Sequence, residues 1–266
     1  MKTRSTQPVA LTIAGSDSGG GAGVQVDLKT FAAFRVHGTS AITCLTAQNP
    51  RAVVAIHPTP PELVRQQIEA VFAELPPQAV KTGMLFSRAN IQIVTAWFRA
   101  PGRPALVVDP VMVASSGARL LRPAAIRALL DQLSPLACLV TPNLDEAEIF
   151  VGRPLRSIED LRWAARQIHR TYGCAALVKG GHLRRLREAV DIFYDGREEL
   201  LLAAPFVRGV TTHGTGCTYS AAITAALARG HSLSESVRLA KEHVTQAIAS
   251  SIRIGRHSTL NAFWKG

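Results

Sequence analysis

Short apolar runs alternate with longer segments of helical periodicity along most of the chain. The runs lie at Val9–Ala14, Ala41–Thr46, Ala79–Thr82, Leu106–Asp109, Ala137–Thr141, Ala175–Lys179 and Val190–Tyr194. Several of them contain almost no polar residue, which is typical of strands that are covered on both faces. The pattern therefore predicts a strand at each run.

The segments between these runs place apolar residues on one side of a helix. Val64, Ile68 and Val71 share a face of the segment Pro61–Leu75, which starts with a proline as many helices do. Further helices are predicted at Ser87–Arg99, Pro123–Leu133, Ser157–Tyr172, Thr215–Arg229 and Leu233–Ile252. Alternating strands and helices indicate an α/β fold with a mostly parallel central sheet and helices on both faces.

The composition of the chain is that of an ordered, globular protein. The 266 residues are 47% hydrophobic and 18% charged, which supplies a core and argues against disorder. No linker or repeat is visible, so we expect one domain over residues 1–266, with residues 1–8 as a flexible N-terminus. No apolar run approaches the roughly 20 residues of a membrane span, and residues 1–8 hold no signal sequence. We therefore expect a cytoplasmic protein with no membrane partner.

A net charge of +11 raises the question of nucleic-acid binding. The basic residues are scattered singly, their densest group is Arg184, Arg185 and Arg187, and aromatic residues make up only 6%. Nucleic-acid binders usually gather charge on one stripe with aromatic residues beside it. We interpret the charge as a solvated surface and expect no nucleic-acid partner, although affinity for anionic small ligands is compatible with it.

The four cysteines form neither a metal-binding pattern nor a disulfide framework. No C-x-x-C pair or zinc-finger spacing is present. Cys44, Cys138 and Cys174 stand in apolar settings and are interpreted as small core residues. Cys217 differs, because its neighbours are glycines and threonines.

Polar residues that follow apolar runs are the candidates for a site, because parallel sheets bind ligands beyond the carboxyl ends of their strands. Residues 15–23 follow the first predicted strand and hold five glycines in nine positions. They match neither a dinucleotide-binding fingerprint nor a P-loop. Glycines let a backbone approach a ligand closely, and a helix start favours anions or polar groups. We interpret the segment as a binding loop; the alternative is an ordinary tight turn.

Two later strand ends carry carboxylates. Asp109 ends a predicted strand, where it could orient magnesium or a substrate proton. The alternative is a turn residue, because aspartate is also common in a turn before a proline. Asn143 and Glu146 could hold magnesium through waters, but a capping box has the same spacing, and spacing alone favours the box. Residues 115–118, Ser-Ser-Gly-Ala, are interpreted as a flexible flap.

The segment Thr211–Ser220 leads into an alanine-rich predicted helix. Backbone amides of Gly214, Thr215 and Gly216 at this helix start would form a nest for an anion with developing charge. Cys217 would lie in the first turn, where the helix dipole lowers the pKa of a thiol, so that a thiolate could accept a proton. The alternative is a tightly packed glycine turn with an inert cysteine.

Four other residues stand near strand or helix ends. Lys179 ends an apolar run, where a lysine needs a partner. Lys241 lies in the last predicted helix and either faces a nucleotide or is solvated. Gln48 offers both a donor and an acceptor, which suits the edge of an aminopyrimidine. Met84 could pack on a flat ring, although filling a core is the commoner use of methionine.

Seven motifs occur here in a diagnostic order. They are AGSDSGGGAGVQVD (14–27), TAQN (46–49), KTGM (81–84), VDPVM (108–112), TPNxxE (141–146), KGGH (179–182) and THGTGC (212–217). From about Ala10 to Lys241, the chain resembles the hydroxymethylpyrimidine and phosphomethylpyrimidine kinases of thiamine biosynthesis, within the ribokinase-like superfamily. The resemblance implies a three-layer ribokinase-like α/β fold and two successive ATP-dependent phosphorylations. It also implies ATP and Mg²⁺ as cofactors and a homodimer.

The resemblance also assigns roles by position. It implies a pyrimidine site made by Gln48, Gly15, Asp27, Met84 and Val111. It implies ATP and phosphate contacts from Asn143, Lys179, Lys241 and Asp109, and magnesium held by Glu146 and Asp109, through water. It implies an anion hole made by Gly214, Thr215 and Gly216, with Cys217 in the place of the aspartate base of sugar kinases.

Two departures and two alternatives accompany this assignment. Thr211 and Thr212 stand where the family commonly has Asn-Thr, and residues 255–264 differ from its usual Gly-His-Gly-Pro run. One alternative is a pyridoxal or pyridoxine kinase of the same superfamily. The other is a ligand-sensing module that has lost catalysis, against which the retention of the motif residues argues.

Overall fold

The computed structural model describes residues 7–112, 121–181, 183, 188–207, 210 and 213–264. The strands are β1 (Val9–Ala14), β2 (His37–Ile42), β3 (Cys44–Asn49), β4 (Ala52–Pro58), β5 (Ala79–Thr82), β6 (Ala105–Val108), β7 (Leu139–Val140), β8 (Ala175–Lys179), β9 (Glu188–Tyr194), β10 (Glu199–Pro205), β11 (Ile252–Ile254) and β12 (His257–Thr259). The α-helices are α1 (Gly23–Ala33), α2 (Pro61–Glu74), α3 (Arg88–Phe98), α4 (Pro123–Ala128), α5 (Leu144–Val151), α6 (Ile158–Tyr172), α7 (Thr215–Ala228) and α8 (Leu233–Ala249).

Within the described residues, eight strands form one sheet in the order β10-β9-β8-β7-β6-β5-β1-β2. Neighbours from β2 across to β8 are parallel. At the other edge, β9 and β10 run antiparallel to their neighbours. The mostly parallel sheet expected from the sequence is therefore confirmed.

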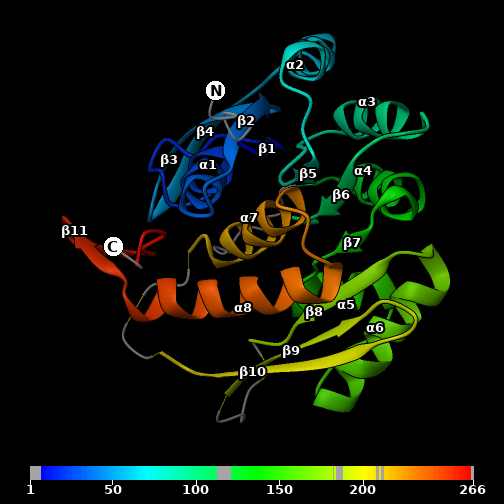
Figure 1. Ribbon diagram of the computed structural model, residues 1–266, viewed down its shortest axis with the longest axis vertical. Coiled ribbons are helices and arrows are strands. Elements are labelled where there is room, and N and C mark those ends of the chain that lie inside the picture. Colours follow the sequence, from blue (N-terminus) through cyan, green and yellow to red (C-terminus); the bar gives the residue numbers. More distant parts are fainter. Residues whose placement is uncertain are drawn as a thin grey trace, which may run out of the picture.

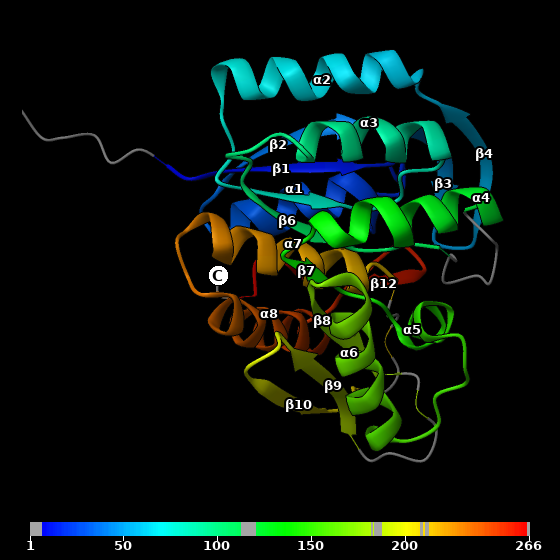
Figure 2. The ribbon, with the colours of Figure 1, turned by 90° about the vertical axis from the view of Figure 1, so that its right-hand side faces the viewer.

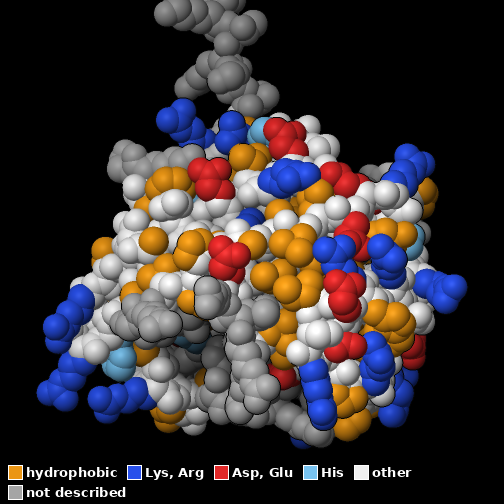
Figure 3. Space-filling view, turned by 90° about the horizontal axis from the view of Figure 1, so that it is seen from below, with side chains coloured by type: hydrophobic (Ala, Val, Ile, Leu, Met, Phe, Trp, Pro, Cys, Tyr) orange, Lys and Arg blue, Asp and Glu red, His pale blue; other side chains and the backbone are white. Residues whose placement is uncertain are grey.

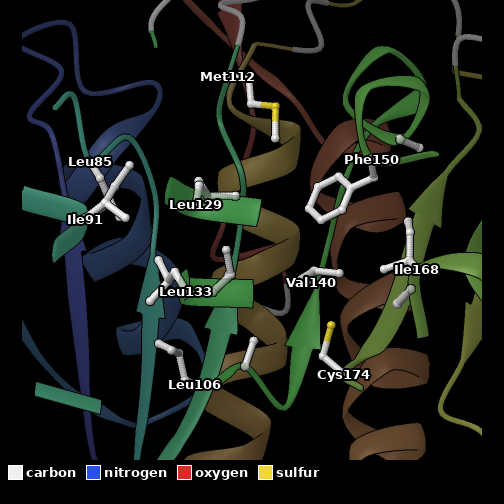
Figure 4. Packing of buried hydrophobic residues seen from close by; sticks show 14 of the residues in the cluster. Leu85, Ile91, Leu106, Met112, Leu129, Leu133, Val140, Phe150, Ile168 and Cys174 are labelled. Carbon is white, nitrogen blue, oxygen red and sulfur yellow. The ribbon is translucent and has the colours of Figure 1, made fainter. Parts of the chain in front are cut away.

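Helices cover both faces of this sheet and make three layers (Figure 1, Figure 2). On one face, Val64 of α2, Ile91 of α3 and Ile168 of α6 belong to a single buried cluster with the strands. On the other face, Ile223 of α7 and Val237 of α8 belong to a second cluster. Figure 4 shows part of the first cluster at close range. Burying such side chains contributes roughly 1.5–3 kcal/mol each, so the two clusters hold the sheet between its helices.

One predicted strand, Ala41–Thr46, proves to be two strands. Thr43 interrupts it, because its N–H donates to the Ala14 carbonyl at 3.0 Å and its hydroxyl donates to the Met84 carbonyl at 2.6 Å. Beyond this residue β3 leaves the sheet and pairs antiparallel with β4 as a separate hairpin. The expectation of one continuous strand is wrong, since an apolar run does not reveal a hydroxyl that diverts the chain.

Helix ends follow local sequence more closely. The hydroxyl of Ser157 accepts from the Asp160 N–H at 3.1 Å, so the predicted start of α6 is confirmed. Gly173, with φ of 76°, ends the same helix in the left-handed region, which glycine adopts without a steric cost. The predicted helix Pro123–Leu133 instead divides into α4 and a π-helical turn, η1 (Leu129–Leu133), before a short 3-10 turn, η2 (Ser134–Leu136).

On the face drawn in Figure 3, lysine and arginine side chains are spread among acidic and apolar ones and do not form one stripe. The group Arg184, Arg185 and Arg187 lies outside the described residues. Among the helices that are described, none is both long and apolar enough to cross a bilayer.

Candidate active site

A cavity of about 560 Å³ lies where the carboxyl ends of the parallel strands meet the start of α7. Every candidate site residue named from the sequence lines it, so the structure brings all of them together. They are Gly15, Asp27, Gln48, Met84, Asp109, Val111, Asn143, Glu146, Lys179, Gly214, Thr215, Gly216, Cys217 and Lys241. Their individual roles stay predictions, and the contacts below bear on each.

Asp17 organises the glycine-rich loop between β1 and α1. Its carboxylate accepts from the backbone N–H groups of Gly19 at 2.8 Å, Gly21 at 3.1 Å and Ala22 at 2.8 Å. Although burial acts to raise it, the pKa of Asp17 stays below its ordinary value because of His213 and these N–H donors. These three amides are thus engaged within the protein, where they hold the shape of a loop that lines the cavity.

The glycine-rich loop touches the segment before α7. The His213 Nε2 lies 3.4 Å from the Asp17 carboxylate. Gly214 caps α7 with φ of 82°, and a Cβ added there would lie 1.9 Å from the Gly21 carbonyl oxygen. Only a glycine permits this approach, so the position of one segment determines the position of the other.

Cys217 lies partly buried in the first turn of α7. Burial raises the pKa of its thiol to about 12. The Lys81 ammonium and the N–H of Gly23 act to lower this pKa, while Asp27 and Asp109 reinforce the increase. The raised pKa favours a thiol at Cys217 over the thiolate expected from its place at the helix start, because burial acts against the charged form.

A fully buried ion pair lies beneath this turn. The Lys81 Nζ is 2.9 Å and 3.0 Å from the two oxygens of Asp27, and both side chains are 0% exposed. The hydroxyl of Thr12 donates to the same carboxylate at 2.6 Å. Although burial would lower it, Asp27 holds the pKa of Lys81 above its ordinary value, so the lysine stays charged. Sequence reasoning assigned no role to Lys81, although a lysine in a buried strand carries the signal that singled out Lys179.

Asp109 and Lys179 form a second pair at the start of α7. The Lys179 Nζ lies 3.3 Å from Asp109 Oδ1, and the hydroxyl of Ser220 donates to Oδ2 at 3.2 Å. A Cβ added to Gly216 would lie 3.2 Å from the Lys179 Nζ, so this glycine lets the ammonium come close to the helix backbone. A positive charge thus stands beside the N-terminal amides of α7, where both favour an anion.

Asn143 and Glu146 make the capping box that their spacing favoured. The Glu146 N–H donates to Asn143 Oδ1, and the Asn143 N–H donates to Glu146 Oε2, both at 2.9 Å. The other oxygen of Glu146 accepts from the Met112 N–H at 3.0 Å. Burial, reinforced by Asp109, raises the pKa of Glu146 to about 7.

These contacts limit how magnesium could bind. No group of three or more potential metal ligands occurs among the described residues. Both oxygens of Glu146 accept backbone hydrogen bonds, and Asp109 is paired with Lys179. The residues do not fit a direct metal centre, and the predicted magnesium site held through water stays a prediction.

The β3–β4 hairpin closes one end of the cavity. There Gln48 and Met84 line it, and no described group hydrogen-bonds to the side-chain amide of Gln48. A Cβ added to Gly15 would lie 2.7 Å from the Met84 Cε and 2.8 Å from the Cys44 Sγ. Gly15 therefore makes room for the methionine. Val111 also lines the cavity and has a φ of 40°, a strained value for a β-branched residue.

The opposite end is lined by β9, β10 and α8, which lie across α7 from the hairpin (Figure 1). Lys241 of α8 forms an ion pair with Asp191 of β9 at 2.7 Å. Lys241 is thus a mostly buried, paired lysine, and the interpretation of a solvated side chain does not hold. Apolar residues flank the pair, among them Ala204 and Val244. Asp191 escaped the sequence reasoning because it was included in an apolar run. The predicted flap at 115–118, and Thr211 and Thr212, lie outside the described residues.

Comparisons with known proteins agree with this geometry. A family model described as phosphomethylpyrimidine kinase matches residues 17–261. The hydroxymethylpyrimidine/phosphomethylpyrimidine kinase of Rhizobium meliloti (strain 1021) is 49% identical over 247 residues, which cover 92% of each chain. The enzyme of that name from Bacillus subtilis (strain 168) is 42% identical and covers 96% of this chain and 94% of its own length.

Solved structures show the same architecture. An ADP complex of Bacillus subtilis pyridoxal kinase has a TM-score of 0.89 at 36% identity and covers 97% of this chain and 98% of its own. Phosphomethylpyrimidine kinase from Clostridium difficile 630 has a TM-score of 0.81 at 40% identity. The match covers 91% of this chain and 100% of that one. These matches confirm the expected ribokinase-like fold, and the sequence matches show that the chain belongs to the phosphomethylpyrimidine kinase family.

Proposed function

We propose that this chain transfers the γ-phosphoryl group of ATP to the hydroxymethyl group of an aminopyrimidine, and then a second phosphoryl group to the monophosphate. The observation that carries the proposal is the start of α7, where the helix N-terminus, the Lys179 ammonium and Cys217 face one cavity. Phosphoryl transfer needs positioning and charge stabilisation more than covalent chemistry, and this constellation supplies both.

In the first transfer, the amides of Thr215 and Gly216 and the ammonium of Lys179 stabilise charge on the migrating phosphoryl group. Cys217 enters as a thiol, because its pKa is about 12. It orients the acceptor hydroxyl instead of removing its proton at the outset. In a loose transition state the nucleophile forms little bond to phosphorus, so its proton leaves late, to an oxygen of the transferred phosphoryl group, and a strong base is not required.

Substrate recognition is assigned to the hairpin end. The Gln48 amide presents a donor and an acceptor together, which complements an amino group beside a ring nitrogen. Met84 and Val111 supply apolar contact for a flat ring. Asp27 is less exposed than expected, since Lys81 and Thr12 occupy its carboxylate, and it acts from beneath the site.

The donor is assigned to the other end, where Lys241, Lys179 and the apolar residues of β10 and α8 lie. Pyridoxal kinase from Staphylococcus aureus, whose fold matches at a TM-score of 0.89, has been solved with ADP and with AMP-PCP. Magnesium would arrive with the nucleotide phosphates and contribute charge neutralisation, with Asp109 and Glu146 reaching it only through water. A homodimer, as the family resemblance implies, is part of the proposal and is checked by sedimentation equilibrium.

Pyridoxal phosphorylation is the second candidate, favoured by the close structural match to pyridoxal kinases. The two are separated by measuring ATP consumption and product mass on a panel of pyrimidine and pyridine alcohols. The proposal expects a pyrimidine monophosphate followed by its diphosphate, at a much higher kcat/KM than pyridoxal. Exclusive formation of pyridoxal phosphate would overturn it, and ATP-independent binding of either compound would favour a sensing module.

A further inference from the structure

The carboxylate of Asp191 connects two walls of the cavity at the end assigned to the nucleotide. Its Oδ2 accepts from the Lys241 Nζ at 2.7 Å, and its Oδ1 accepts from the Gly180 N–H at 3.1 Å. Lys241 belongs to α8, whereas Gly180 directly follows β8. One side chain on β9 therefore fixes the distance between an ammonium on one wall and the backbone of the other.

The Lys241 ammonium keeps capacity for a ligand. Of its three N–H donors, one goes to Asp191 and a second to the Ala189 carbonyl at 3.1 Å. The side chain of Lys241 is 11% exposed, that of Asp191 is 6% exposed, and both line the cavity. The third donor is thus available to a phosphate oxygen, while the carboxylate is the more buried member of the pair.

Gly180, whose N–H binds this carboxylate, is closely surrounded. A Cβ added to Gly180 would lie 2.4 Å from both the Val190 carbonyl oxygen and the Leu161 Cδ1, so the backbone is confined there. The Gly180 N–H is also shared with the Val190 carbonyl at 3.0 Å. Asp191 and Lys179 are register partners on adjacent strands, so the same anchor lies next to the lysine at the start of α7.

The ion pair with Lys241 explains how Asp191, a carboxylate, can lie in a cavity that is assigned to the phosphates of a nucleotide. An unpaired carboxylate there would repel phosphate, whereas one that is paired with an ammonium is neutralised by it. Together the two groups carry no net charge before the nucleotide arrives, yet they present a fixed ammonium to it. Because a charge-assisted hydrogen bond holds the lysine in place, less side-chain freedom is lost when phosphate binds.

We propose that Asp191 is a positioning residue for nucleotide binding, which is anchored on the Gly180 N–H and holds the Lys241 ammonium in place for the donor phosphates. This inference rests on the proposed function, since it takes ATP as the donor. It assigns Asp191 no contact with the reacting atoms.

The test is a double-mutant cycle on ADP affinity, measured by isothermal titration calorimetry on the full chain without acceptor. Asp191→Asn keeps an acceptor for Gly180 but removes the charge, and Lys241→Met removes the ammonium at similar length. We expect Asp191→Asn to weaken ADP binding about tenfold in the wild-type background, as loss of a charge-assisted contact does. In the Lys241→Met background we expect the same substitution to change ADP affinity by less than about twofold, because coupled residues are not additive.

Arg238→Gln is the matched control. It removes another contact between α8 and the β9–β10 hairpin, the exposed pair with Glu198 at 3.2 Å, which does not line the cavity. We expect unchanged ADP affinity. The KM for the acceptor should stay within about twofold in Asp191→Asn while the KM for ATP rises, a split that general destabilisation would not produce.

Equal losses of ADP affinity in both backgrounds would overturn the proposal, as would a raised acceptor KM with normal ADP binding. If Asp191→Asn alone does not fold, the double variant, which leaves no unpaired charge, is compared with Lys241→Met. A tenfold difference in ADP affinity between those two would also refute coupling through Lys241. A wild-type chain that binds ADP but phosphorylates no pyrimidine would refute the proposed function and leave this cycle interpretable.

Discussion

Replacing Gly214 by alanine tests whether kcat depends on the close contact between the glycine-rich loop and the start of α7. The new Cβ would meet the Gly21 carbonyl oxygen at 1.9 Å, whereas real Cβ contacts essentially never fall below 3.0 Å. One of the two segments must therefore move by about 1 Å, a displacement that can reduce rate about a hundredfold. The φ of 82° adds left-handed strain of about 1–2 kcal/mol.

Gly152→Ala is the control for that strain. Gly152 also has a positive φ, 71°, but nothing lies within 4 Å of an added Cβ. Urea unfolding should show a loss of about 1 kcal/mol for Gly152→Ala with normal kcat, whereas Gly214→Ala should lose kcat about a hundredfold while it remains folded. Equal kcat values for the two variants, measured as ADP release at saturating ATP, would refute the reasoning.

Four further predictions concern the cavity. Alkylation of Cys217 by iodoacetamide, followed by peptide mass mapping, should accelerate about tenfold per pH unit from pH 7 to 10, because the thiol pKa is about 12; a plateau below pH 9 would contradict this. Lys81→Met should cost about 3 kcal/mol in urea unfolding by leaving Asp27 buried and unpaired, and adding Asp27→Asn should restore most of it. Gln48→Leu should raise the KM of the aminopyrimidine about tenfold without a matching change for pyridoxal, which competition assays would show. The folded-state pKa of Glu146, about 7, exceeds its ordinary 4.5, so its contribution to stability should be present at pH 4.5 and lost as pH rises through 7. Glu146→Gln should flatten that part of the pH profile of unfolding.

Sequence alone located the buried strands well and the exposed ones poorly. The bounds predicted for β1, β5 and β8 are those observed, because each is an apolar run covered on both faces. β4 was not predicted, since most of its side chains are exposed and no alternation marks it. β10 carried a usable signal that was overlooked, the apolar run at residues 200–204, although the alternating burial of its side chains appears only in the structure.

The candidate site was predictable in composition and less so in chemistry. Polar residues at strand ends converge because parallel strands share one carboxyl edge, so every named residue lines the cavity. The state of Cys217 was not predictable, since its pKa depends on burial and on Asp27 and Asp109, which come from distant segments. Lys81 and Asp191 were missed as site residues for the same reason. Each is a charged residue within a segment that was interpreted only as an apolar strand.

In the proposed function the start of α7 serves two acceptors in turn, and Cys217 acts on the alcohol but not on the monophosphate. The direct measurement is a product time course for Cys217→Ala with ATP and hydroxymethylpyrimidine, and separately with the monophosphate. The second acceptor is already largely ionised at neutral pH and needs no group to orient a hydroxyl proton. We predict that the first transfer slows at least about tenfold more than the second. Equal slowing of both transfers would contradict this role of Cys217.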